Sequence, residues 1–335
     1  MKMSLDRFFT TRAQSIPVGR ALPFDIFLKI SGELILFKRT GDTLTQQRLD
    51  NLIKHSVIEI YILKEQRDLY LKSLKEIVKD PDSSDELRGR FIKETAFNHI
   101  QDLFSNKDVS TIAKESTGLI EDMVDFISTD LSAANTLMKL STHDYYTYNH
   151  SINVSVYSIA ICKSILGEDK KLLVTAGLGG LLHDLGKRKV DLKLINKPGK
   201  LDPEEWIEMK KHPGYGFELL QDIPTISNEV KRIVHEHHEH MDGTGYPAGI
   251  SEQQILKLSR IASVADVFDA LTTKRSYKDA CSAQEALEIM AKMPEGKFDP
   301  EVFKLLETRT DKKNDITLDK SVDPCVPQLH FKKTG

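Results

Sequence analysis

Apolar and polar positions follow two different patterns along the chain, and the change separates a short mixed region from a long helical one. The mixed region holds runs of β-branched and aromatic residues as well as one-sided apolar faces. The expected elements are a strand over residues 24–30, a turn at Ser31-Gly32, a strand over 33–39, a helix over 44–54, a strand over 57–63 and a helix over 65–78. Residues 1–78 are therefore predicted to form a small α+β accessory or regulatory module.

A polar break and a long helical pattern follow this module. Residues 79–90 combine Pro, Ser, Asp and Gly without apolar periodicity, which predicts a linker. From residue 91 to about 307 the apolar residues recur with a period of 3.6, with Pro or Gly breaks near residues 198, 213, 224, 247 and 294. Residues 308–335 are polar and predict a loosely ordered tail. The expected fold class is mainly α, with a helical C-terminal domain and a small N-terminal α+β domain.

Composition limits the cellular compartments and the classes of binding partner expected for the protein. The 335 residues include 47 basic and 50 acidic side chains, and a net charge of -3 gives no electrostatic case for duplex nucleic acid. The three cysteines are far apart, as expected in a reducing compartment. The longest apolar run, residues 172–182, is too short to cross a bilayer, and the first residues lack the apolar core of a signal peptide. The pattern favours a cytoplasmic protein without membrane contact.

Histidines are the most informative residues of the helical region. Eight of the eleven lie between positions 143 and 240, although a helical domain has no packing need for so many imidazoles there. Each one alone is compatible with an ordinary structural role. Together, five histidines and two aspartates fall at helix ends or on inward-facing positions, and imidazole with carboxylate is a common set of metal ligands. These residues are His150, His183, Asp184, His212, His237, His238 and Asp266.

Several segments around these residues form a longer signature. The most specific is HHEHMDGTGYPAGI at residues 237–250; others are HSINV at 150, HDLGK at 183, MKKHPGYG at 209, RIASVADVFDALTTKRSYK at 260 and GKFDPEVFKLL at 296. In this order they resemble the HD-GYP branch of the HD-domain metal-dependent phosphohydrolases. The resemblance covers roughly residues 140–307 and leaves out the N-terminal module.

The resemblance implies an all-helical HD-type bundle around a metal centre, in a family of bacterial phosphodiesterases that hydrolyse cyclic di-GMP. Carried over to this chain, one metal would be held by His150, His183, Asp184 and Asp266. Asp184 would bridge to a second metal held by His212, His237 and His238. Members with a third metal carry a Glu where this chain has Tyr146, so two divalent metal ions are expected. Iron is the first choice on the resemblance, with Mn, Zn and Ni as alternatives.

The implied reaction is attack of a metal-bridging hydroxide on the phosphodiester. Asp184 and Lys187 are the expected catalytic residues, since the family motif includes this lysine. Arg275 and Lys278 resemble a phosphate-binding pair, and Tyr246 of the GYP loop is expected to contact the ligand. The ordinary alternative for Lys187, Arg275 and Lys278 is a solvated surface charge.

Three functions stay open on the sequence alone. The first is an active cyclic di-GMP phosphodiesterase that releases either the linear dinucleotide or GMP. The second is a catalytically weak or inactive sensor that binds metals and signals through protein contacts, and the third is a phosphohydrolase of another nucleotide. A protein partner at the GYP loop and a homodimer are further expectations. No sequence motif indicates which ligand the N-terminal module binds.

Overall fold

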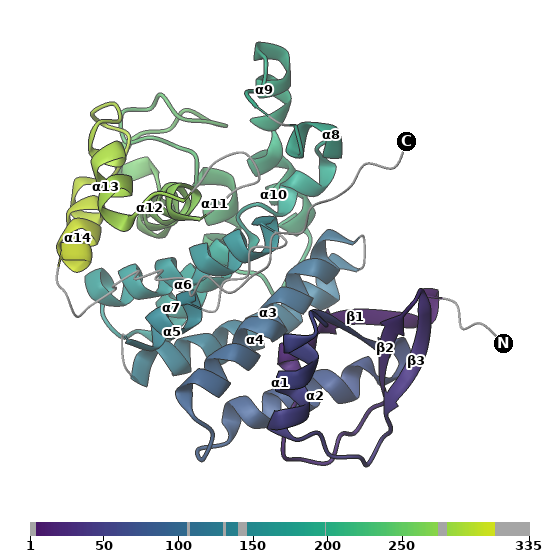
Figure 1. Ribbon diagram of the computed structural model, residues 1–335. Coiled ribbons are helices and arrows are strands. Elements are labelled where there is room, and N and C mark those ends of the chain that lie inside the picture. Colours follow the sequence, from purple (N-terminus) through teal and green to yellow (C-terminus); the bar gives the residue numbers. More distant parts are fainter. Residues whose placement is uncertain are drawn as a thin grey trace.

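The computed structural model describes residues 5–105, 108–129, 132–139, 146–197, 199–273 and 280–311. A small sheet with two helices forms the N-terminal part, and helices make up the rest (Figure 1). Within the described residues the strands are β1 (Phe8–Arg12), β2 (Ile26–Ile30), β3 (Glu33–Lys38) and β4 (Glu59–Leu63). The helices are α1 (Gln46–Lys54), α2 (Arg67–Lys79), α3 (Asp85–Phe104), α4 (Val109–Thr129), α5 (Ser132–Lys139), α6 (Tyr146–Leu166), α7 (Lys170–Leu182), α8 (Leu192–Ile195), α9 (Pro203–Met209), α10 (His212–Gln221), α11 (Asn228–Glu236), α12 (Lys257–Thr272), α13 (Ala283–Ala291) and α14 (Pro300–Asp311). Short 3-10 helices include η4 (Leu185–Lys189) and η5 (Glu252–Gln254).

The N-terminal sheet is antiparallel, with the strand order β1-β4-β2-β3. The alternation along β4 sorts its side chains between the two faces. Ile60 and Ile62 join the main core together with Tyr70 of α2, while Tyr61 packs with Phe8 and Phe27 in a small cluster. The predicted hairpin at Ser31-Gly32, the third strand and both helices of the module are confirmed, so the fold class is mainly α with a small N-terminal α+β part.

Strand β1 was not expected from the sequence, because the first fifteen residues are predominantly polar and charged. Its five residues pair only with β4 at the edge of the sheet. A short edge strand needs few apolar residues, and in β1 Phe8 is buried on one face while Phe9 packs against Tyr70 of the main core on the other. Sequence patterning gives little signal for such a strand.

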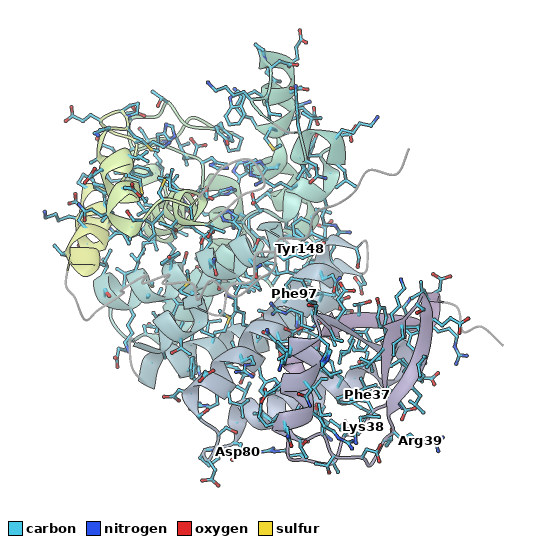
Figure 2. The ribbon with its side chains drawn as sticks, viewed as in Figure 1. Phe37, Lys38, Arg39, Asp80, Phe97 and Tyr148 are labelled. Carbon is cyan, nitrogen blue, oxygen red and sulfur yellow. The ribbon has the colours of Figure 1, made fainter. Side chains whose placement is uncertain are left out.

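The sheet is joined to the helical bundle through a buried polar contact and a row of rings. Arg12 of β1 donates from Nε to Oε2 of Glu94 on α3 at 2.6 Å, and the Thr11 hydroxyl lies 2.7 Å from Oε1. The Arg12 guanidinium also lies over the Phe97 ring at 4.9 Å, and Phe97 packs edge-on against Tyr148 of α6 at 5.6 Å (Figure 2). One continuous apolar core therefore runs from the module into the bundle.

One predicted boundary differs from the structure, and one predicted helix break is present. Helix α3 begins at Asp85, inside the segment expected to be a linker, because the Ser84 side chain accepts a hydrogen bond from the Leu87 amide and caps it. The expected break near residue 213 is present, since α9 ends at Met209 and α10 begins at His212 with Pro213 in its first turn. Proline is tolerated in the first turn, where no backbone N–H is needed. The division of the chain into domains stays a prediction.

Helices α6, α7 and α12 form the centre of the bundle, flanked by α3 and α4 on one side and by α13 and α14 on the other (Figure 1). Most of the described side chains of α6 and α12 are buried, and α7 is apolar apart from Thr175 and the two lysines at its start. Helix α11 packs beside α7, and α10 packs on α11 and on the η4 turn. Polar side chains that point inward from these helices must therefore satisfy one another away from water.

Candidate metal centre

The structure brings all seven residues expected to bind metal into one cluster. His150 lies on α6 and Asp266 on α12, while the others lie at helix ends. His183 and Asp184 follow α7, His212 begins α10, and His237 and His238 follow α11. The carboxylates and all the imidazoles but that of His238 are almost fully buried. We call His150, His183, Asp184 and Asp266 the carboxylate half of the cluster, and His212, His237 and His238 the imidazole half.

Asp184 lies between the two halves. Its Oδ1 is 3.3 Å from Nε2 of His212, in the imidazole half. Its Oδ2 is 3.4 Å from Nε2 of His183 and 3.8 Å from Nε2 of His150. One carboxylate therefore presents an oxygen to each half, which is the arrangement that a bridging ligand requires.

Two carboxylates orient the His150 ring in the carboxylate half. Asp266 Oδ1 lies 3.0 Å from Nε2 of His150, and Asp269 Oδ2 lies 2.8 Å from Nδ1 on the other side of the same ring. Asp269 Oδ1 in turn accepts hydrogen bonds from Asn153 and Thr273 at 2.8 and 2.9 Å. Burial lowers the pKa of His150, but the bonds to Asp266 and Asp269 outweigh it and raise that pKa to about 9.

Backbone carbonyls orient two rings of the imidazole half, and His183 of the carboxylate half in the same way, since its Nδ1 lies 2.8 Å from the Gly180 carbonyl. Nδ1 of His212 lies 2.8 Å from the Met209 carbonyl, and Nδ1 of His237 lies 2.9 Å from the Val234 carbonyl. If each Nδ1 donates its proton there, both Nε2 atoms carry lone pairs directed into the cluster. Burial lowers the pKa of His212 to about 3 and that of His238 to about 4, and it holds the pKa of His237 well below its usual range.

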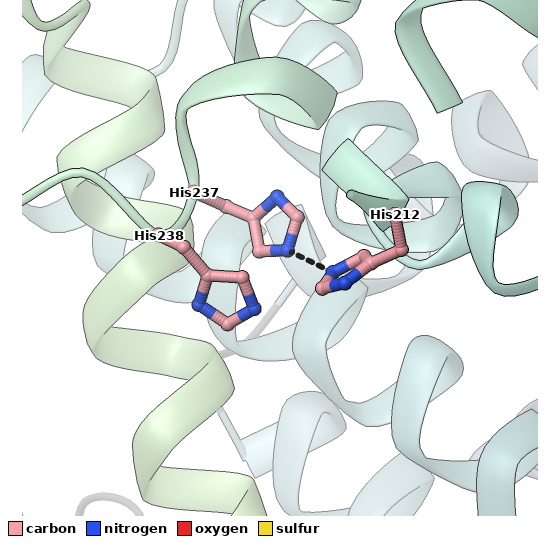
Figure 3. A group of neighbouring side chains, drawn as sticks. All are labelled: His212, His237 and His238. Carbon is pink, nitrogen blue, oxygen red and sulfur yellow. Dashed lines mark hydrogen bonds between the residues drawn. The ribbon is translucent and has the colours of Figure 1, made fainter. Parts of the chain in front are cut away.

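The nitrogen and oxygen atoms of the cluster are arranged to bind a metal ion rather than to hydrogen-bond to one another. The Nε2 atoms of His212 and His237 face each other at 3.2 Å, where two lone pairs repel unless a cation lies between them (Figure 3). Among the described residues, the buried His183 Nε2 and Asp184 Oδ1 are also without a hydrogen-bond partner. Buried polar atoms are rarely left unpaired. Nitrogen and oxygen donors in this arrangement are suitable ligands for divalent metals.

Lys187 lies at the edge of the cluster on η4. Its Nζ is 2.6 Å from Asp184 Oδ2, and its side chain is 24% exposed where that of Asp184 is 2% exposed. Burial opposes ionisation of Asp184, yet Lys187 and His183 keep the pKa of its carboxyl well below the usual value. Lys187 would share a face with His183 only if helix α7 continued beyond His183. The helix ends at Leu182, and the tighter η4 turn directs Lys187 to Asp184.

Glycine is required at two positions beside the cluster. A Cβ on Gly186 would lie 1.8 Å from the His212 carbonyl oxygen, so η4 can approach α10 only without a side chain. A Cβ on Gly245 would lie 2.4 Å from the His240 amide and 2.6 Å from the His238 carbonyl. Gly186 of HDLGK and Gly245 of the GYP signature therefore each have a packing reason that involves a histidine of the cluster or its neighbour.

The GYP loop folds back over the imidazole half. The Tyr246 amide donates to the His238 carbonyl at 3.1 Å, and the Tyr246 ring lies 4.7 Å from the His238 ring. Glu239 closes the loop by accepting from the Ala248 and Gly249 amides at 2.7 and 3.1 Å. Burial and the charges of Asp266 and Asp184 raise the pKa of Tyr246. Tyr246 thus forms a wall of the cluster.

Other predicted residues have different outcomes. Arg275 and Lys278 lie outside the described residues, as does the side chain of Tyr146. Sequence reasoning missed Asn153, although a polar residue one turn after His150 in an apolar helix is a readable signal. It also missed Lys297. Burial lowers the pKa of the Lys297 side chain, and the negative charge of Asp266 partly opposes that shift.

Comparison with known proteins places this cluster in a family. The family model described as "HD domain" matches residues 129–302, just over half of the chain. The chain belongs to the HD-domain family. HD-domain phosphohydrolases use divalent metals, and the His–Asp cluster supplies the donors. The resemblance inferred from the motifs is confirmed.

Two curated relatives carry informative names. This HD-domain chain is 42% identical over 192 residues to "Cyclic di-GMP phosphodiesterase PA4108" of Pseudomonas aeruginosa, covering 56% of this chain and 46% of the relative. It is 36% identical over 162 residues to "3'3'-cGAMP-specific phosphodiesterase 3" of Vibrio cholerae, covering 48% and 35%. The chain thus spans less than half the length of these two relatives.

A solved structure has the same fold over nearly the whole chain. Bd1817, an HDG"Y"P protein from Bdellovibrio bacteriovorus, superimposes with a TM-score of 0.70 at 24% identity, covering 90% of this HD-domain chain and 98% of its own. Coverage this high includes the N-terminal module as well as the bundle. Among the described residues, no helix has both the length and the apolar character needed to cross a bilayer.

Proposed function

We propose that this HD-domain protein is a metal-dependent phosphodiesterase that hydrolyses cyclic di-GMP. The observation that carries the proposal is the buried cluster in which Asp184 presents one oxygen to each half. The names of relatives that are phosphodiesterases of cyclic di-GMP or cGAMP support the substrate class. A cyclic dinucleotide has two phosphodiester groups, and one of them would lie at the cluster.

The cluster would hold two divalent metal ions. His150, His183 and Asp266 would bind one ion, the imidazole half would bind the other, and Asp184 would bind both. Ions bound there lower the pKa of water and neutralise the charge of a phosphodiester. Mixed nitrogen and carboxylate ligands are compatible with iron, which we propose as the native metal, and with Mn, Zn and Ni.

The protein itself supplies position and charge for the reaction. In hydrolysis a water oxygen bonds to phosphorus, one P–O ester bond breaks, and the leaving oxygen takes up a proton. Lys187 is the partly exposed cation at the cluster edge, where its ammonium can hold a phosphate oxygen or the leaving oxygen. Tyr246 would limit access of water from the GYP-loop side. Arg275 and Lys278 are proposed as cations for the remaining phosphate.

Turnover by the full chain tests the proposal. Protein purified without oxygen and loaded with Fe²⁺ or Mn²⁺ should cleave cyclic di-GMP, while 3'3'-cGAMP and cyclic di-AMP serve as alternative substrates. Chromatography then separates linear dinucleotide from GMP, and elemental analysis gives metal identity and stoichiometry. Two bound metals without cleavage of any substrate would reject the enzyme and favour a metal-binding adaptor. A protein partner at the GYP loop and a homodimer remain predictions.

A further inference from the structure

Trp206 is an exposed aromatic residue close to the metal cluster and is the sole tryptophan of the chain. It lies on α9, which projects beyond the bundle (Figure 1). The side chain of Trp206 is 46% exposed, and its neighbour Ile207 is 57% exposed. A large aromatic side chain on a projecting helix contributes little to a core, so its position needs another explanation.

A row of rings connects Trp206 to the cluster. The His238 ring lies 4.7 Å from the Tyr246 ring, and the Tyr246 ring lies 6.2 Å from the Trp206 ring at an interplanar angle of 79°. A nearly perpendicular contact covers at most one face of the indole. Trp206 therefore offers a free aromatic face two ring contacts away from the cluster.

The helix that carries Trp206 is firmly held. Asp202 and Glu205 form a capping box at its start, and Lys197 pairs with Glu205. At its far end Glu208 accepts from the Tyr215 hydroxyl at 3.1 Å. The ring is thus presented by an ordered element, which reduces the conformational entropy lost when a ligand stacks on it.

We propose that Trp206 is a stacking platform for a purine base of the substrate, while a phosphate of the same molecule lies at the cluster. The assignment rests on the proposed function, because it takes a cyclic dinucleotide as the ligand. Stacking of a base on an aromatic side chain is independent of hydrogen-bond pattern, and removal of the side chain typically weakens binding about five- to a hundredfold.

The experiment compares Trp206→Ala, Trp206→Phe and the control Ile207→Ala in the full metal-loaded chain. Ile207 is also exposed on the same helix but points about 100° away around its axis. For cyclic di-GMP, Trp206→Ala should raise KM five- to a hundredfold, Trp206→Phe should keep KM within about threefold, and Ile207→Ala should leave it unchanged. Methyl p-nitrophenyl phosphate, which has no base, should show the same KM with all variants.

Fluorescence gives an independent readout, because Trp206 is the only tryptophan. Cyclic di-GMP should quench the emission of the wild-type protein, whereas methyl p-nitrophenyl phosphate at equal occupancy should quench it less. Metal content and circular dichroism confirm that the Ala variant is folded. An unchanged KM in Trp206→Ala, an equal loss on both substrates, or a Phe variant as weak as Ala would overturn the platform while the proposed function stands. A wild-type protein that neither binds nor cleaves a cyclic dinucleotide would overturn both.

Discussion

The two halves of the cluster differ at His150, whereas His183 of the carboxylate half shares the backbone-carbonyl contact of His212 and His237. In the carboxylate half, Asp266 and Asp269 hold the His150 ring from both sides and raise its pKa to about 9. In the imidazole half, backbone carbonyls hold His212 and His237, and burial keeps the rings neutral. Neutral imidazoles bind a cation without losing a proton, whereas a protonated His150 must first release one. At neutral pH, His212 is therefore neutral and can bind a cation directly, whereas His150 carries a proton that a metal ion must displace.

The largest expected effect comes from removing the residue that the halves share. Asp184→Ala takes away an oxygen from each half and leaves Lys187 without its partner. We expect the purified variant to lose at least one metal and its turnover to fall by more than about a hundredfold. Elemental analysis and turnover measure both. Two metals retained at wild-type affinity would show that Asp184 does not bridge.

Gly186→Ala should break the imidazole half selectively. The added Cβ would meet the His212 carbonyl oxygen at 1.8 Å, so α10 must shift and carry His212 away from the cluster. A loss of about 2–3 kcal/mol in the free energy of unfolding is expected, together with loss of the metal in that half. Gly214→Ala is the matched control, since a Cβ there meets nothing within 4 Å. Equal unfolding midpoints for both variants would contradict the packing argument.

Asp269→Asn should weaken the carboxylate half while sparing the imidazole half. The substitution keeps the shape but removes the charge that orients His150 and raises its pKa. Loss of such a supporting group typically lowers metal affinity 10- to 100-fold. Titration with Mn²⁺ should show one weakened and one unchanged site. If both sites weaken alike, the halves are not independent.

The smallest effect is a difference in pH dependence between the halves. A raised pKa means that His150 stays protonated up to about pH 9. As the pH rises toward that value, the metal affinity of the carboxylate half should increase by as much as about tenfold per pH unit. The imidazole half should be insensitive to pH above about 5, because His212 and His238 have pKa values of about 3 and 4. Calorimetry in buffers of different ionisation enthalpy would show about one proton released at pH 7. Release of none would contradict a protonated His150.

The sequence predicted which histidines and aspartates gather in the cluster but not how their side chains are held. The histidines and aspartates at helix ends can be recognised from their residue types, and the GYP signature indicates that they belong to one site. The groups that orient His212 and His237 are backbone carbonyls, which every residue carries, so no pattern reveals them. The η4 turn that directs Lys187 to Asp184 depends on the close approach allowed by Gly186, which only three-dimensional packing reveals.

The same contrast holds for the fold. One-sided apolar faces and alternating strands predicted most elements, because burial on one face is a strong local signal. Polar capping residues at the start of α3 had the composition of a linker, since Ser and Asp favour both helix starts and loops. Contacts such as Arg12 to Glu94, which join the module to the bundle, connect residues more than eighty positions apart. Local pattern carries no information on such pairs.

The spacing of the ligands along the chain has a consequence for how the protein folds. His212 and His237 are 25 positions apart and belong to neighbouring helices, so their encounter closes a short loop. His150 and Asp269 are 119 positions apart and meet only when α12 docks on α6. Because closing a long loop costs more entropy, the imidazole half should assemble early, together with Asp184, which lies 28 positions before His212 and contacts it, while the contacts of His150 with α12 form late. A nascent chain would then meet its first metal ion with three imidazoles and one carboxylate, before Asp266 and Asp269 are in place to select it.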